Sequence, residues 1–198
     1  MTTTTSTRAS AAMMGMAFGV SMMILFGAAW LAWGFQSMRT DSPWLIAAVT
    51  LGGIALLVPC FSIFQIGSKA GKKSAPLTYE EKRIQREMGK MFGIIFGAEG
   101  LAIFLTVSAL NHFQLESYIS TAIAAIVGLH FLPLARLYRF SLYYAIGGVM
   151  LLESLIFLTL PSPMREIAVE LSMGATLWLT CILVLREGFL LARSFEQA

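Results

Sequence analysis

The chain has 198 residues, of which 57% are hydrophobic and 13% are charged, and its formal net charge at pH 7 is +3. Soluble domains carry about one quarter charged residues, so this composition argues against a soluble globular domain and favours a membrane protein. The positive charge does not indicate nucleic acid, because the Lys and Arg residues lie between apolar runs, as they do in membrane-protein loops. We therefore expect the lipid bilayer as the main partner and no nucleic acid.

Six segments are apolar enough to cross the hydrocarbon layer, a crossing that takes about 20 residues. They cover residues 11–35, 44–66, 91–110, 116–136, 140–160 and 167–186. The sequence therefore predicts an all-α integral membrane protein, with residues 11–198 forming a single domain of six transmembrane helices. Too little chain remains outside these segments for a soluble catalytic domain.

The chain opens with the polar stretch "MTTTTSTRAS", which predicts a disordered tail over residues 1–10. The apolar run that follows is about 25 residues long, whereas the apolar part of a signal peptide has about 7 to 15. A cleaved signal peptide is the alternative, but this length favours a retained first span.

Residues 67–90 form the longest segment between spans, and they predict a basic cytoplasmic loop that ends in an amphipathic helix. Thr78 and Glu81 have the spacing of a capping box, which marks a helix start. One apolar stripe follows, made of Tyr79, Ile84, Met88 and Met91. The helix either lies at the lipid headgroups or serves as a gate or docking site for a partner.

The Lys and Arg residues also predict the orientation of the chain. With the N-terminus in the cytoplasm, 12 of the 14 Lys and Arg residues lie on the cytoplasmic side, and Arg39 and Arg165 lie outside. Because cytoplasmic loops of membrane proteins are enriched in Lys and Arg, this asymmetry predicts cytoplasmic N- and C-termini.

Similar segments occur along the chain. "GMAFGVSMMILF" at residues 15–26 and "GIIFGAEGLAIF" at 93–104 carry Gly and Phe at the same offsets. This pattern suggests three repeated two-helix hairpins, with chance resemblance between apolar segments as the alternative. The spacing of Gly15 with Gly19 and of Gly93 with Gly97 lets helices approach closely, so a homodimer is a further expectation.

Four ionisable residues lie inside the predicted spans: Glu99, His130, Glu153 and Glu170. An ionisable group within hydrocarbon is costly and is by default a hypothesis about function. Glu99 lies 14 residues before a turn near Phe113, and His130 lies 17 after it. At 1.5 Å per residue their depths differ by about 5 Å, so neighbouring antiparallel helices would bring the two together. Such a pair can carry or share a proton.

A similar count brings Glu153 and Glu170 to within about 5 Å of each other in depth, on either side of a turn near residues 162 and 163. Two carboxylates so placed would titrate as a coupled pair. Glu170 is also shallow enough to reach the outer interface instead. The alternative for all of these carboxyls is a purely structural role, in which a protonated Glu donates a hydrogen bond to a neighbouring helix.

The sequence contains no motif of a phosphate-binding loop, a dinucleotide fold or a zinc protease, and no Cys-x-x-Cys pair. We therefore expect no cofactor, no metal and no catalytic nucleophile. Cys60 and Cys181 lie inside spans and read as small apolar residues, with a disulfide or a metal pair as the alternative.

"MFGIIFGAEG" and "GLHFLPLARLYR", from the third and fourth spans, resemble segments of small bacterial multi-spanning membrane proteins of unknown function. The resemblance implies a bacterial inner-membrane location and supplies no substrate. We expect transport or binding of a small solute or protons through a cavity with Glu99 and His130 at its core. In this interpretation Glu153 is a second acidic site and Glu170 an outer entry group.

Two alternatives remain open at this stage. The first is an intramembrane enzyme that acts on a lipid or isoprenoid substrate with a buried Glu as general acid. The second is an accessory membrane subunit whose acidic residues seat a partner helix.

Overall fold

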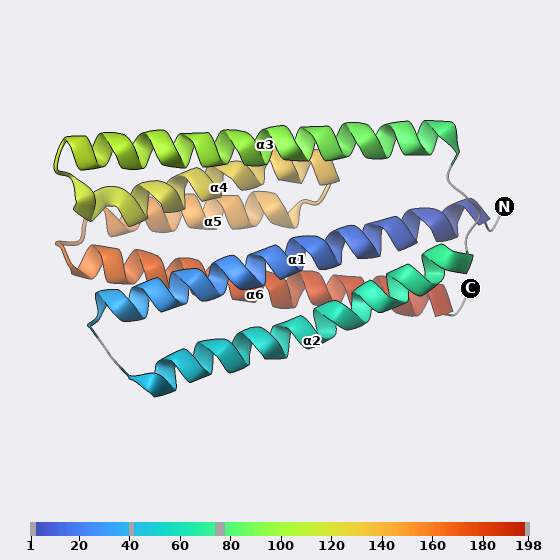
Figure 1. Ribbon diagram of the computed structural model, residues 1–198, viewed down its shortest axis with the longest axis horizontal. Coiled ribbons are helices and arrows are strands. Elements are labelled where there is room, and N and C mark those ends of the chain that lie inside the picture. The colour runs from blue at the N-terminus through green and yellow to red at the C-terminus, as the bar shows by residue number, and fades with distance from the viewer. Residues whose placement is uncertain (1–2, 40–41, 74–77, 197–198) are drawn as a thin grey trace. The chain divides into compact units, whose positions relative to one another are not determined.

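The computed structural model describes residues 3–39, 42–73 and 78–196, and all regular structure in them is helical (Figure 1). These residues form six α-helices and one short 3-10 helix, η1. The elements are α1 (Thr3–Ser37), α2 (Pro43–Lys73), α3 (Tyr79–His112), η1 (Glu116–Tyr118), α4 (Ile119–Tyr138), α5 (Leu142–Phe157) and α6 (Met164–Glu196). The prediction of an all-α fold is confirmed.

Five of these helices are long and apolar enough to cross a membrane, within the part of the chain that the structure describes. The exception is α5, whose 16 residues extend only about 24 Å at 1.5 Å per residue. Composition and helix lengths together are those of a multi-span helical membrane protein. The repeat of three hairpins stays a prediction.

Several helices are longer than the apolar runs that predicted them. α1 begins at Thr3, within the expected tail, and α2 continues to Lys73, within the expected loop. The hydrogen-bonded ladder needs no apolar side chains, so it can continue into the polar boundary of a membrane. α3 begins at Tyr79, one residue after Thr78, where the capping box predicts a start, and it runs without interruption through the third span.

The described helices divide into two compact units, and α1 and α6 contribute to both. The first unit comprises Met1–Ala32, Ser42–Thr78 and Leu177–Ala198, and the second comprises Trp33–Asp41 and Tyr79–Thr176. Each unit has its own packing, and all four predicted site residues lie in the second.

In the first unit, small residues let the helices approach closely. A Cβ atom added to Gly52 would lie 2.6 Å from the ring of Trp178, so the absence of a side chain makes room for the indole. The indole Nε1 donates a hydrogen bond to the carbonyl of Ile24 at 3.2 Å. Trp178 of α6 therefore contacts α2 through its ring and α1 through its polar edge.

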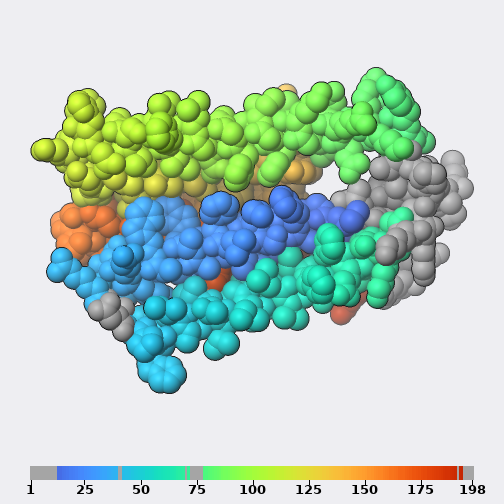
Figure 2. Space-filling view, viewed as in Figure 1, coloured from blue at the N-terminus to red at the C-terminus, as the bar shows by residue number. Residues whose placement is uncertain are grey.

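In the second unit, α4 packs along both α3 and α5 (Figure 1). The closest approach is between α4 and α5, where a Cβ on Gly147 would lie 2.7 Å from the carbonyl oxygen of Gly128. α3 has no buried residue, and atoms along its whole length are visible in Figure 2. α4 is thus the central helix of this unit, and it carries His130.

The contact between α4 and α5 predicts opposite effects for two adjacent glycines. Gly147→Ala places a methyl group against the backbone of α4, and such overpacking costs about 1–3 kcal/mol of unfolding free energy. Gly148→Ala meets nothing within 4 Å. Gly148→Ala should therefore leave the unfolding free energy unchanged or raise it by up to about 1 kcal/mol, because alanine favours the helical conformation. Unfolding in mixed micelles of increasing SDS content measures both, and equal effects would contradict the close contact.

Candidate functional site

The structure places Glu99 beside His130, as the depth estimate predicts. Oε2 of Glu99, on α3, lies 3.2 Å from Nδ1 of His130, on α4. The two side chains are 12% and 9% exposed. The distance is within ion-pair range, although Nδ1 makes no hydrogen bond of good geometry within the described residues. A proton on either group would therefore lie within reach of the other.

Two aromatic rings flank the imidazole of this pair. Phe96, one turn before Glu99 on α3, presents its ring edge-on to His130, with 6.1 Å between the ring centroids. Phe131 flanks the imidazole from α4 itself. α4 continues through Pro133, which cannot donate a backbone hydrogen bond to the carbonyl of Leu129. The helix thus leaves the carbonyl of Leu129, the residue before His130, without its usual helical donor.

Glu153 has a partner other than the expected one. Its Oε1 accepts a hydrogen bond of 3.0 Å from the hydroxyl of Thr176 on α6, and its Oε2 is buried without a hydrogen bond among the described residues. Thr176 lies six residues beyond Glu170, which is about 9 Å along a helix. The predicted depths of Glu153 and Glu170 assumed 1.5 Å per residue up to the turn. α5 ends at Phe157, however, and the non-helical residues after it extend farther along the chain axis per residue than helical ones do.

Glu170 is 1% exposed, so it does not lie open at a surface as an entry group would. The hydroxyls of Ser37, at the end of α1, and Ser120, at the start of α4, face its carboxyl group. Its acidic neighbour is Glu166, one helical turn earlier on α6. Glu166 accepts a hydrogen bond of 2.7 Å from the hydroxyl of Ser162.

Arg165 is a buried cation that the sequence analysis treated only as an outside charge. It is 5% exposed, and its guanidinium donates to the carbonyl and the hydroxyl of Ser117, at 3.2 and 2.9 Å from Nη2. The same group lies 3.9 Å above the ring of Tyr118. Arg165 therefore fastens the start of α6 to η1 and to the start of α4.

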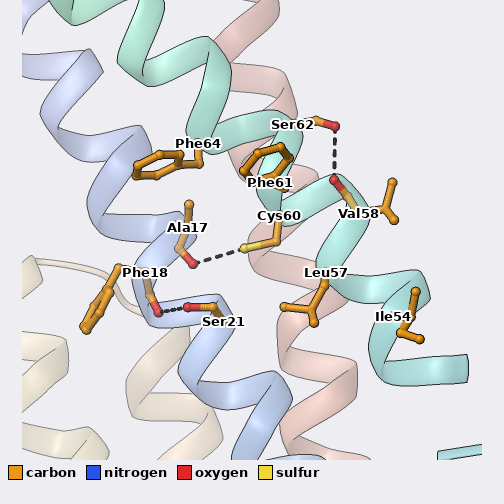
Figure 3. A pocket seen from close by; sticks show the side chains of 10 residues that line it. All are labelled: Ala17, Phe18, Ser21, Ile54, Leu57, Val58, Cys60, Phe61, Ser62 and Phe64. Carbon is orange, nitrogen blue, oxygen red and sulfur yellow. Dashed lines mark hydrogen bonds between the residues drawn. The ribbon is translucent and has the colours of Figure 1, made fainter. Parts of the chain in front are cut away.

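The first unit contains an open apolar groove of about 580 Å³ between α1 and α2 (Figure 3). Its lining includes Phe18, Leu57, Phe61 and Phe64 and no Asp, Glu, His, Lys or Arg. Cys60 donates to the carbonyl of Ala17 at 3.1 Å. Cys60 and Cys181 are free and buried, so they form no disulfide. This groove holds no acid or base for catalysis.

The residues that serve as partners are not among the predicted site residues: Thr176, Ser37, Ser120, Ser117 and Glu166. A signal existed for Glu166, which stands four residues before Glu170 and so shares its helix face. No signal existed for the hydroxyls, because Ser and Thr are common in membrane helices. No group of three or more His, Cys, Asp or Glu residues that could hold a metal occurs among the described residues.

No family model, curated protein or solved structure matches this chain. The resemblance of the third and fourth spans to small bacterial membrane proteins therefore gains no family from these comparisons. The function must be inferred from the residues themselves.

The contact between α3 and α4 predicts energetic coupling between Glu99 and His130. In a double-mutant cycle with Glu99→Gln and His130→Gln, we expect a coupling free energy of about 0.5–1.5 kcal/mol, the range of polar contacts between membrane helices. SDS unfolding of the four proteins measures it. A cycle of Glu116→Gln with His130→Gln is the control, since Glu116 is exposed, and should give no coupling. Independent effects of the first pair would contradict the contact.

Proposed function

We propose that this chain is a six-span inner-membrane protein that binds and moves protons at the Glu99–His130 pair. The observation that carries the proposal is the 3.2 Å approach of a carboxyl to an imidazole, both about nine-tenths buried, inside two apolar helices. Imidazole exchanges its proton close to neutral pH, so a neighbouring carboxyl can receive or supply that proton.

The six-span topology counts α5 as a span in addition to the five long helices. α5 alone is short, but the apolar run around it covers residues 140–160. An even number of spans puts both termini on the same side, and the distribution of Lys and Arg favours the cytoplasm for that side. The basic segment over residues 67–90 is then cytoplasmic.

Glu153 is proposed as a second proton-binding group. Its Oε2 is buried and makes no hydrogen bond within the described residues, while Oε1 is held by Thr176. One oxygen is thus fixed and the other is left to accept a proton. The pair of Glu153 with Thr176 links α5 to α6, as the pair of Glu99 with His130 links α3 to α4.

The enzyme and accessory-subunit alternatives predict different behaviour. A lipid-modifying enzyme needs an acid beside an apolar groove, and the groove between α1 and α2 is lined by no carboxyl or imidazole. Such an enzyme would turn over substrate in detergent without a gradient. An accessory subunit would lose its partner on purification when Glu99 and Glu153 are changed to Gln, with no effect on flux. Homodimerisation through the Gly93 and Gly97 face is compatible with each role.

The proposal is tested by proton uptake into liposomes that contain the full-length protein and a trapped pH-sensitive dye. A potassium gradient with valinomycin drives the protons inward. We expect uptake above that of empty liposomes, and a loss of at least about tenfold in Glu99→Gln and in His130→Gln, as for removal of a general acid or base. Glu116→Gln is the matched control and should keep the wild-type rate. Wild-type uptake equal to that of empty liposomes, or unchanged uptake in Glu99→Gln, would overturn the proposal.

A further inference from the structure

A second polar cluster lies where α1 ends and where α4 and α6 begin, within the second unit. It comprises Glu166 and Glu170 of α6, Ser120 of α4 and Ser37 of α1. The helices are held closely here, because a Cβ added to Gly34 would lie 2.7 Å from Cδ2 of Leu171. Ser37 stands one turn beyond Gly34, so this contact brings its hydroxyl toward Glu170.

Three oxygen atoms of this cluster are buried without a hydrogen bond among the described residues. They are Oε2 of Glu166, Oε2 of Glu170 and Oγ of Ser120. The Glu170 and Ser120 residues are 1% and 2% exposed. A buried polar atom with no partner costs about 1–3 kcal/mol, and a buried charge costs more. Three buried oxygens from two helices, none with a well-aligned hydrogen bond among the described residues, indicate a missing ligand.

The neighbouring guanidinium group does not act as the missing ligand of these oxygens. Arg165 directs its guanidinium to Ser117 and to the ring of Tyr118. No salt bridge to Glu166 or Glu170 is present in the part of the chain that the structure describes. The two carboxyls stand four residues apart on one helix, where like charges repel, so a positive ligand between them would stabilise the folded protein.

We propose that Glu166, Glu170, Ser120 and Ser37 bind a hard divalent cation of the calcium type. All four donors are oxygens, which hard cations prefer, and the cluster contains no nitrogen or sulfur ligand of the kind that zinc or copper takes. Two carboxyls balance two positive charges. Calcium accepts six to eight oxygens in irregular arrangements and completes its shell with water, whereas magnesium requires near-octahedral geometry.

Occupancy of this site would tie the end of α1 to the starts of α4 and α6. Because the cation binds only when these helices are together, it adds to the stability of the folded chain. The site involves neither Glu99 nor His130, so it stands independently of the proposed proton function. In the proposed orientation it faces the outer side of the membrane.

Calcium binding to the full-length protein in nanodiscs of zwitterionic lipid tests the proposal. Isothermal titration with CaCl2 gives the affinity, and the thermal midpoint in CaCl2 against EGTA, at constant ionic strength, gives the linked stability. We expect one saturable site per chain and a higher midpoint with calcium. Glu170→Gln should weaken the affinity at least about tenfold, since it removes a charged ligand worth 1.4 kcal/mol or more. Ser120→Ala should weaken it less.

The control variants are Glu116→Gln, an exposed carboxyl, and Ser172→Ala, whose hydroxyl bonds within its own helix to the carbonyl of Val169. Both should bind calcium like the wild type. If Glu170→Gln does not fold, Glu166→Gln and Ser120→Ala carry the test. The proposal is overturned if calcium gives neither heat nor a midpoint shift, if sodium gives the same shift, or if affinity is unchanged in Ser120→Ala and the Glu variants. A midpoint that responds to pH alone would assign a shared proton to the carboxyls instead.

Discussion

The structure depends on one constraint: within hydrocarbon there is no water to satisfy a polar group, so partners must come from the protein. Helices satisfy the backbone, and three buried ionisable side chains then turn toward a neighbouring element. Glu99 meets His130, Glu153 meets Thr176, and Arg165 meets Ser117. These contacts each join two elements, so the same interactions that satisfy the polar groups also fix which helices are neighbours.

Small residues let helices of the second unit approach closely. At Gly128 and Gly147, α4 and α5 approach until backbone nearly touches backbone, and at Gly34 the last turn of α1 lies against Leu171. Close approach matters because Ser and Thr side chains are short and can reach a carboxyl only across a narrow gap. The contact at Gly34 thus places the end of α1, which carries Ser37, beside the part of α6 that carries Glu170.

The sequence predicts the helices well, because long apolar runs leave few alternatives in a bilayer. It also predicts the approach of Glu99 to His130, since α3 and α4 remain helical almost to their shared turn. Counting residues from the turn does not predict the partner of Glu153, because the chain after Phe157 is no longer helical and covers more depth per residue than a helix does. The roles of Ser120 and Thr176 could not be predicted, because only the packing decides which hydroxyl faces a carboxyl.

The approach of Glu99 to His130, across α3 and α4, is the contact on which the proposed function depends. Solid-state NMR of the protein in lipid, with 13C-labelled Glu and 15N-labelled His, measures the distance from the carboxyl carbon of Glu99 to the ring nitrogens of His130. We expect dipolar dephasing that corresponds to about 3–4 Å, as for an ion pair, and its loss in Glu99→Gln. Absence of that coupling in the wild-type protein, under conditions where both residues are detected, would show that the two side chains do not meet in the membrane.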